Sequence, residues 1–352
     1  MSKCNLLILS PYLDLSGGVA TFVKSLKGQW GVNERYFYRG GRGKHLAKYF
    51  NTIVELSTFL LGLLYYKNSK VFINTSLNKK AYTRDKIFCK ISIFLKKDVY
   101  LFIHGWDTHF FDEVKGEFNK SSFFKAKKIY VLAQSFKDSL VSVGFFEKDI
   151  IVEHTVVQER FFSEFKSFEK KFSNAPIHLL FLARLEAVKG IFTVLETFKT
   201  LFEKDSNFIL NVAGSGTETD QVKKWIAQNR KLPINFHGRV EGDAKINLFK
   251  ASHFYLLPTT HPEGLPISIL EAITAGCIVF VTPAGGLKDF FEDRDMGFLL
   301  QDSLTSELIS KIEFAVKDFE LLKKIASNNI SRGQELYTPL SLINRIKSNI
   351  YG

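Results

Sequence analysis

Residues 261–276 read His-Pro-Glu-Gly-Leu-Pro-Ile-Ser-Ile-Leu-Glu-Ala-Ile-Thr-Ala-Gly, and this stretch predicts a short buried helix. Pro266 suits the first helical position, and Gly276 suits the position just past the last turn. Glu271 lies four residues after Ile267, so both side chains lie on the same face of the helix. The apolar-periodic residues that we expect to face a core are Ile267, Leu270, Ile273 and Thr274.

The same stretch is a candidate ligand site. An ionised carboxylate on a buried face is costly unless a polar group meets it, so Glu271 needs a partner. Gly264-Leu265 precedes the helix and offers backbone N–H groups at the positive end of the helix dipole, which suits a phosphate. We therefore expect a phosphorylated ligand above the helix start, with Glu263 and Glu271 holding its hydroxyl groups. The alternative is a capped core helix in which Glu271 pairs with a buried Lys or Arg.

Length and composition favour a two-domain protein of the cytoplasm. At 352 residues the chain exceeds the usual size of a single core, and its 45% hydrophobic and 24% charged residues are ordinary for a globular protein. Three widely spaced cysteines give neither a disulfide framework nor a metal pattern, which favours a reducing compartment. The first apolar run is too short for a signal peptide, and the longest one, 53–66, contains Glu55 and is too short to span a bilayer.

Short β-rich runs alternate with helical periodicity along the whole chain. This alternation predicts an α/β protein with parallel sheets and helices on both faces. The expected strands are 6–10, 71–74, 99–104, 128–133, 178–183, 208–213, 234–237, 254–258 and 278–282. The expected helices are 19–29, 45–66, 85–97, 135–143, 191–203, 219–229, 243–251 and 266–275.

These elements form two similar halves. We expect an N-terminal Rossmann-like domain at 1–158, a connection at 159–176 and a C-terminal Rossmann-like domain at 177–352. The last helix, at about 336–352, is expected to cross back to the N-terminal domain. Two doubly wound domains bind ligands in the cleft between them, at the carboxyl ends of their strands.

Positive charge is concentrated in the first half. Residues 1–155 hold 24 Lys and Arg against 13 Asp and Glu, whereas residues 156–352 hold 24 against 23. Such asymmetry indicates an anionic partner for the first half: a membrane, a nucleic acid or a phosphorylated acceptor. We expect the anionic inner-membrane surface, with the protein peripheral on its cytoplasmic face. The alternative is a set of scattered lysines that only solvate the surface.

The basic segment 79–97 carries much of this charge. Its cations are Lys79, Lys80, Arg84, Lys86, Lys90, Lys96 and Lys97. Its apolar residues at helical spacing are Ile87, Phe88, Ile91, Phe94 and Leu95. An apolar stripe with a basic flank is typical of helices that lie in a membrane interface. The alternative is a core-packed helix with solvated lysines.

Two cations follow the expected strand 178–183. Arg184 and Lys189 lie between this strand and the next helix, and Gly190 permits close approach. A guanidinium fork and a compact ammonium at a strand's carboxyl end suit a diphosphate leaving group. The alternative is a pair of surface cations in a loop.

Weaker candidates lie at other strand ends. Gly17-Gly18 opens the first helix, and Gly214-Ser215-Gly216 follows the strand 208–213; each is also compatible with a plain turn. His104 and Asp107 end the strand 99–104, where His104 could bond a sugar hydroxyl or assist proton transfer. A structural histidine that closes a strand is the alternative.

Taken together, in this order, these motifs resemble the retaining GT-B glycosyltransferases of family 4. The resemblance covers nearly the whole chain and is strongest from 184 to 286, where the Glu-x7-Glu element at Glu263 and Glu271 is the specific feature. It implies the GT-B fold, in which two Rossmann-like domains face a central cleft. It also implies a hexosyltransferase-type enzyme that moves a sugar from a nucleotide-diphosphate sugar to a glycan or lipid-linked glycan acceptor in bacterial surface polysaccharide synthesis, such as O-antigen, capsule or lipopolysaccharide.

The resemblance also implies roles for the site residues. Arg184 and Lys189 would neutralise the diphosphate, and Glu271 would hold the ribose hydroxyls. The donor sugar and phosphate would contact Glu263 and the amides of Gly264 and Leu265. The other donor-binding residues would be Gly17, Gly18, Gly214, Gly216 and Val240. Of these, Val240 would contact the base through its backbone groups. The first domain would bind the acceptor through His104 and Asp107. No metal and no cofactor are expected, because the cations take over the metal's role.

Two other classes of protein are compatible with some of these features. A nucleotide-sugar epimerase of the same architecture would also bind a diphosphate here, but it would react without an acceptor. A basic nucleic-acid-binding protein is compatible with the charge and with the 14% aromatic content. Because no nucleic-acid motif is present and the basic residues are interleaved with core patterns, we expect no nucleic-acid partner.

Overall fold

The computed structural model describes residues 4–15, 17–40, 46–165, 176–261 and 264–352. The chain forms two compact units. Unit 1 comprises residues 1–156 and 339–352, and unit 2 comprises residues 157–338. In the described part of the chain, no helix is both long enough and apolar enough to cross a membrane.

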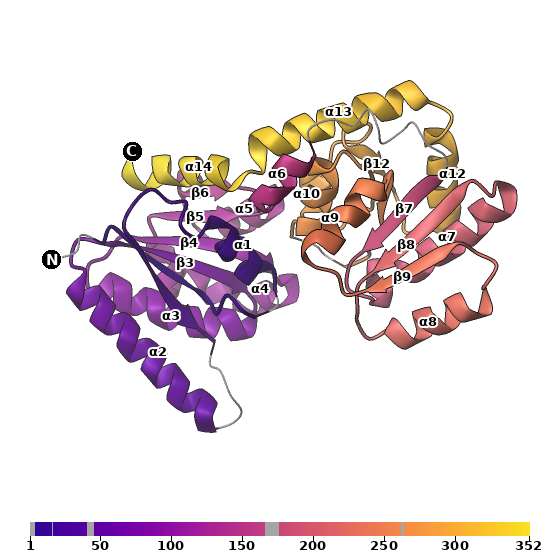
Figure 1. The fold of residues 1–352 in the computed structure, drawn as a ribbon. Helices are drawn as coiled ribbons and strands as arrows, with labels where there is room; N and C mark the ends of the chain where they lie inside the picture. Colours follow the sequence, from indigo (N-terminus) through magenta and orange to yellow (C-terminus); the bar gives the residue numbers. More distant parts are fainter. Residues whose placement is uncertain (1–3, 16, 41–45, 166–175, 262–263) are drawn as a thin grey trace. The chain divides into compact units, whose positions relative to one another are not determined.

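Unit 1 is built on a six-stranded parallel sheet with the order β2-β1-β3-β4-β5-β6 (Figure 1). Its strands are β1 (Leu6–Pro11), β2 (Glu34–Arg39), β3 (Lys70–Leu77), β4 (Val99–Trp106), β5 (Lys128–Val131) and β6 (Ile150–Val152). β1 pairs with β2 on one side and with β3 on the other, so the direction of winding reverses between β1 and β3. Ligands of doubly wound sheets bind at the carboxyl ends of the strands beside such a reversal.

Helices cover both faces of this sheet. They are α1 (Gly18–Leu26), α2 (Leu46–Tyr65), α3 (Lys79–Phe94), α4 (Thr108–Val114), α5 (Gln134–Ser142) and α14 (Pro339–Tyr351), with the 3-10 turns η1 (Lys115–Lys120), η2 (Ser122–Lys125) and η3 (Glu147–Asp149). Alternate strand residues point to opposite faces. Leu101 therefore joins the core that contains Phe59 of α2 and Phe88 of α3. Phe102 packs instead against Phe22 of α1, with ring centroids 4.9 Å apart.

Unit 2 contains a second six-stranded parallel sheet, with the order β12-β11-β10-β7-β8-β9. Its strands are β7 (Ile177–Leu182), β8 (Phe208–Ala213), β9 (Ile234–Gly238), β10 (Phe254–Leu257), β11 (Ile278–Val281) and β12 (Gly297–Leu299). Its helices are α6 (Glu159–Glu164), α7 (Ile191–Lys204), α8 (Thr219–Gln228), α9 (Gly242–Ala251), α10 (Ile267–Thr274), α11 (Leu287–Phe290), α12 (Thr305–Ala315) and α13 (Phe319–Leu336), with the 3-10 turn η4 (Ala187–Lys189). β7 and β10 are adjacent, so the winding reverses between them.

The predicted α/β architecture with two parallel sheets is confirmed, and several local predictions are corrected. β2, β6 and β12 were not predicted, because they are short or mix charged with aromatic residues. α3 begins at Lys79 rather than at 85, since Asn78 caps it by accepting a hydrogen bond from the Ala81 N–H at 3.0 Å. The expected connection 159–176 begins with a helix, α6. Residues 166–175 of that connection lie outside the described residues.

A buried ion pair anchors α3 to the sheet of unit 1. Arg39 at the end of β2 and Asp85 on α3 are 1% and 0% exposed, and Nη2 lies 2.7 Å from Oδ2. Asp85 also accepts from Thr75 Oγ1 at 2.5 Å and pairs with Arg84 at 2.7 Å. Burial lowers the pKa of Arg39 to about 10, opposed by the attraction of Asp85. Arg39 also donates to the backbone carbonyl of Asn74, so the pair fixes the end of β3 as well.

Removing one partner of this pair would leave a buried charge without its counter-charge. We expect Asp85→Asn to lower the free energy of unfolding by about 3–5 kcal/mol. Urea unfolding followed by circular dichroism measures this change. Asp149→Asn is the matched control, because Asp149 pairs with Lys128 at a partly exposed site and such pairs contribute about 1 kcal/mol or less. An equal loss in both variants would contradict the anchoring role.

Candidate functional site

The winding reversal of unit 2 brings two loops to one edge of the sheet. The loop after β7 holds residues 183–190, and the loop after β10 leads to α10. The carbonyl oxygen of Val188 accepts hydrogen bonds from the Thr260 N–H at 2.9 Å and from Thr259 Oγ1 at 3.0 Å. Because the carboxyl ends of adjacent parallel strands meet at such a reversal, these loops form the expected position of a ligand site.

Both predicted cations lie in the loop after β7, but their environments differ. The Arg184 side chain is 63% exposed and its Nη1 lies 2.5 Å from Glu186 Oε1. Lys189 ends the turn η4 and is only 5% exposed, so it is not a surface cation. The loop therefore offers one exposed guanidinium and one largely buried ammonium at the same strand end.

Glycines allow the loops of this edge to pack on one another. Gly190 has a φ of +80°, and a Cβ there would lie 2.3 Å from the carbonyl oxygen of Pro258. A Cβ on Gly214 would lie 1.9 Å from the Ala183 oxygen, and one on Gly216 would lie 2.3 Å from the Leu185 oxygen. Gly214 and Gly216 were predicted to bind the donor. Their packing gives these two glycines a structural reason of their own, namely support of the loop that carries the cations.

Glu271 is buried in α10 and is met by a cation. Its side chain is 2% exposed, and Oε1 lies 2.5 Å from Lys245 Nζ on α9, whose side chain is 18% exposed. Burial raises the pKa of Glu271, and the charge and hydrogen bond of Lys245 oppose that rise. The pairing was anticipated as the structural alternative for Glu271, but Lys245 itself was not identified. Only the fold brings α9 against α10, so the sequence carried no signal for it.

The start of α10 is tied to the end of β7 through a tyrosine. The hydroxyl group of Tyr255 on β10 lies 3.0 Å from the Leu182 carbonyl oxygen and 2.8 Å from Ser268 Oγ. Sequence reasoning missed Tyr255, since nothing in the chain marks a strand tyrosine as a link between loops. The link keeps the first turn of α10 beside the cation loop.

The residues before α10 differ in part from the expectation. Pro266 precedes the first helical residue, Ile267, and has an extended ψ of 126°, so it caps α10 instead of opening it. Gly276 follows the helix with a φ of +67°, as expected of a terminating glycine. Leu265 is buried and Gly264 is half-buried. Glu263 lies outside the described residues, so its proposed contact with the donor sugar stays a prediction.

The remaining predicted donor residues lie at strand ends. Val240 is half-buried and follows β9. In unit 1, Gly17 has a φ of +151° and precedes α1, which begins at Gly18. A Cβ on either glycine would meet no described atom within 4 Å, so neighbouring atoms do not require glycine here. The positive φ of Gly17 does require it.

His104 is held as a neutral imidazole in unit 1. Its ring stacks on Phe102 at 4.3 Å, and Nε2 lies 3.0 Å from Asn74 Oδ1. Because Asn74 Nδ2 donates to the Leu9 carbonyl at 3.3 Å, its oxygen faces His104, which places the imidazole proton on Nε2. Burial lowers the pKa of His104 to about 3, and the charge of Arg39 acts in the same direction. His104 is therefore suited to accept a hydrogen bond through Nδ1.

Asp107 has a structural task beside its predicted one. It caps α4 by accepting a hydrogen bond from the Phe110 N–H at 3.0 Å. Its exposed carboxylate therefore has a structural role that does not depend on an acceptor.

The described residues contain no group of three or more His, Cys, Asp or Glu that could hold a metal ion.

The part of the chain that contains the cation loop and α10 matches a known family. Residues 162–332 match the family model described as Glycosyl transferases group 1. This match confirms the resemblance to glycosyltransferases that the sequence indicated for this region, while the assignment to family 4 stays a prediction.

Individual relatives agree with the family match. The chain is 28% identical over 265 residues to an uncharacterised glycosyltransferase of Methanocaldococcus jannaschii, a match that covers 70% of this chain and 63% of the relative. It is 26% identical over 151 residues to the lipopolysaccharide 1,2-N-acetylglucosaminetransferase of Salmonella typhimurium, covering 40% of each chain. The matches thus span less than two thirds of the length of either relative.

Solved structures confirm the fold over the full length. The crystal structure of Anabaena HepE in complex with UDP and glucose is similar with a TM-score of 0.72 and 15% identity, covering 99% of each chain. At that identity the likeness speaks for the fold and not for the substrate. The predicted GT-B fold is confirmed.

The pairing of Glu271 with Lys245 generates a test that depends on pH. An acid whose pKa is raised on folding makes the fold more stable once it is protonated, so stability increases as the pH falls through the folded-state pKa. Lys245→Met removes the group that opposes this rise. We expect the variant to be less stable than the wild type by about 3 kcal/mol at pH 8, because breaking a buried pair leaves a charge uncompensated, and to recover part of this loss at pH 5. Melting temperatures at both pH values measure the effect.

The double variant Lys245→Met/Glu271→Gln is the control. It carries no charge at the pair, so the loss specific to high pH should disappear. If Lys245→Met were as stable as the wild type at pH 8, the ion pair would not be a structural requirement of unit 2.

Proposed function

We propose that the protein is a retaining, metal-independent glycosyltransferase of family 4 that uses a nucleotide-diphosphate sugar as donor. The observation that carries the proposal is the convergence of Arg184, Lys189 and the start of α10 at the winding reversal of unit 2, inside the region that matches group 1 glycosyltransferases. The HepE structure contains UDP and glucose, which supports a uridine nucleotide as the first donor to test.

The donor would bind with its diphosphate beside the cation loop. Lys189 would supply a fixed positive charge from its largely buried position, and Arg184 would exchange Glu186 for a phosphate oxygen. The backbone N–H groups at the start of α10 would face the same anion. Glu271 would accept hydrogen bonds from the ribose hydroxyls through the oxygen that does not contact Lys245.

Transfer with retention needs no protein nucleophile in this scheme. The bond between the anomeric carbon and the diphosphate oxygen breaks, and the acceptor hydroxyl forms its new bond on the same face of the sugar. The proton of that hydroxyl passes to the departing phosphate oxygen. The positive charges around the diphosphate stabilise the negative charge that develops there, which is the main contribution of the protein to the rate.

The acceptor would be a glycan, and we favour a lipid-linked intermediate of bacterial surface polysaccharide synthesis. The Salmonella relative acts on lipopolysaccharide, which supports this class of acceptor. His104 would contribute an accepting nitrogen, because its imidazole is neutral at physiological pH. We place the reaction on the cytoplasmic face of the membrane, where nucleotide sugars are available.

Nucleotide binding and transfer test this proposal directly. We expect one of UDP, GDP or ADP, at about 100 times its dissociation constant, to stabilise the protein by about 2.7 kcal/mol in a thermal-shift screen.

Lys189→Ala and Arg184→Ala should each reduce turnover on the order of 100-fold or more, because each removes charge stabilisation of the leaving group. Lys204→Ala, which loses an exposed lysine at the far end of α7, is the control and should keep full turnover. Nucleotide-sugar epimerisation without any acceptor would overturn the transferase proposal.

Chelation tests the metal independence. The phosphate-binding groups proposed above are cations and backbone amides, whereas Mg²⁺ and Mn²⁺ sites are built from oxygen ligands. We therefore expect excess EDTA to leave transfer unchanged. Loss of activity on chelation, restored by Mn²⁺, would contradict the assignment of charge neutralisation to Arg184 and Lys189.

A further inference from the structure

Over residues 50–65, the exposed face of α2 is mostly apolar, with Ser57 and Thr58 as its exposed polar side chains. Its most exposed large side chains are 47–68% exposed, and they are Phe50, Ile53, Val54, Leu61, Leu64 and Tyr65. Within residues 50–66 the only charged residue is Glu55, which is 7% exposed and accepts a hydrogen bond from the Gly40 N–H at 3.1 Å. Proteins that stay in water rarely expose a contiguous apolar patch of this kind, so α2 indicates an interaction surface.

α3 lies beside α2 and continues this surface with charge added (Figure 1). Ile87 is 47% exposed and Phe94 is 82% exposed, and the exposed Lys90 lies between them on the same helix face. The sequence had suggested a broader stripe, but Phe88 is buried in the core. The exposed apolar side chains of α3 on this surface are thus Ile87 and Phe94, and the half-buried Ile93 lies near them.

Not every cation of the basic segment 79–97 is available to a partner. Arg84 pairs with the buried Asp85 at 2.7 Å. Lys97 is 8% exposed and donates to the carbonyl oxygens of Tyr66 and Lys67 at 2.6 and 2.5 Å. Arg84, whose side chain is 25% exposed, and the buried Lys97 are thus engaged in contacts within unit 1, so the charge available for binding lies on other lysines.

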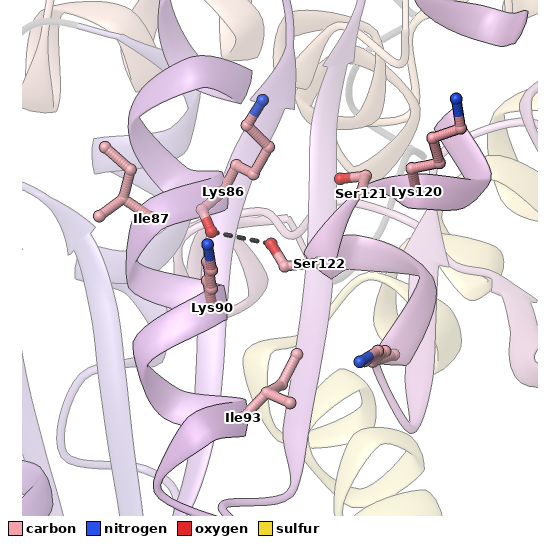
Figure 2. A pocket seen from close by; sticks show the side chains of 8 residues that line it. Lys86, Ile87, Lys90, Ile93, Lys120, Ser121 and Ser122 are labelled. Carbon is pink, nitrogen blue, oxygen red and sulfur yellow. Dashed lines mark hydrogen bonds between the residues drawn. The ribbon is translucent and has the colours of Figure 1, made fainter. Parts of the chain in front are cut away.

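A pocket rich in lysine lies beside the face of α3 that carries Ile87 and Lys90 (Figure 2). It has a volume of about 440 Å³ and is lined by Lys86, Ile87, Lys90, Ile93, Lys120, Ser121, Ser122 and Lys125. Figure 2 shows Lys86 and Lys90 on α3 opposite Ser121 and Ser122, with Ser122 Oγ donating to the Lys86 carbonyl at 2.8 Å. Of the lining lysines, Lys120 pairs with Glu117 at 3.7 Å, whereas no described acidic residue forms a salt bridge with Lys90 or Lys125. Several ammonium groups around one pocket suit a phosphate.

We propose that the outer faces of α2 and α3, together with this lysine pocket, form a docking surface for an anionic lipid bilayer. The apolar side chains enter the interfacial layer of the bilayer, and the pocket holds headgroup phosphates. An interfacial helix needs an apolar face and neighbouring positive charge, and here α2 supplies the first while α3 and η2 supply the second. The proposed binding is peripheral: the surface contacts one leaflet, and no described helix is long and apolar enough to cross the membrane.

Charge decides between a bilayer and a second copy of the chain as the occupant. Residues 1–155 have a net charge of +11, from 24 basic and 13 acidic residues. A symmetric pair of copies meeting at this surface would bring lysines against lysines. A bilayer with anionic headgroups offers phosphate and hydrocarbon side by side, which matches the adjacent pocket and apolar face.

The inference deepens the proposed function, because a lipid-linked acceptor is located at a membrane. It is tested without any nucleotide sugar, so its failure and the failure of the transferase proposal are distinguishable. Co-sedimentation of the full chain is measured with vesicles of phosphatidylcholine alone and with vesicles that contain phosphatidylglycerol. We expect binding to the second kind only, weakened as the salt concentration rises.

Two variants separate the two parts of the surface. Lys86→Gln, Lys90→Gln and Lys125→Gln combined should weaken binding to anionic vesicles by about two orders of magnitude, since each lysine near the leaflet contributes about a factor of five. Leu61→Ser combined with Phe94→Ser should weaken binding at low and at high salt alike, because it removes inserted side chains. Both variants should keep the circular dichroism spectrum of the wild type, as all five side chains lie at the surface.

Matched controls change the same residue types elsewhere on the surface. Lys224→Gln, Lys231→Gln and Lys317→Gln remove three exposed charges from unit 2, and Leu304→Ser with Phe146→Ser removes two exposed apolar side chains. Both controls should bind like the wild type. Equal loss in control and test variants would overturn the docking surface. A second outcome would also overturn it: the wild-type protein does not bind anionic vesicles, and light scattering shows a dimer that dissociates when Leu61→Ser and Phe94→Ser are combined.

Discussion

The donor site proposed in unit 2 is built around one buried carboxylate. Glu271 lies in the middle of a helix whose other residues are almost entirely apolar, and among the described residues Lys245 alone forms an ion pair with it. Such a pair is a weak source of stability, because removing two charges from water costs about as much as their attraction returns. We therefore propose that Glu271 serves as a ligand group rather than as a source of stability. In the proposed complex the carboxylate exchanges part of its contact with Lys245 for ribose hydroxyls, and it meets them without first being desolvated.

The scaffold around that carboxylate is made of hydrogen bonds between loops and of glycines that allow close packing. Val188, Thr259 and Thr260 join the loops after β7 and β10. Gly214 and Gly216 let the loop after β8 support the cation loop from the other side. Loops that brace one another in this way hold their positions without a ligand. Positive charges that are already in position do not have to be reoriented when negative charge develops on the leaving group, so no reorganisation energy is spent on them.

The sequence was a good guide where a local pattern determines the structure and a poor one where only the fold does. Strands that are buried on both faces, such as β8, were predicted within a residue, because continuous apolar runs between turns have few other solutions. β2 was missed, since its alternating charged and aromatic residues resemble no buried strand. Pro266 was placed one position too far into α10, a common difference at helix ends. Lys245 could not be found, because its partner lies 26 residues away on another helix.

The path of the chain makes unit 2 an insertion into unit 1. Residues 339–352 return to unit 1 as α14, where Arg345 forms hydrogen bonds to Glu153 at 2.9–3.1 Å and Lys70 donates to the Ile350 carbonyl. During synthesis, the first 156 residues therefore leave the ribosome long before their last helix exists. Unit 1 lacks the contacts of α14, which packs against α1, until unit 2 has been synthesised. The inserted unit can therefore be complete before the unit that surrounds it in sequence.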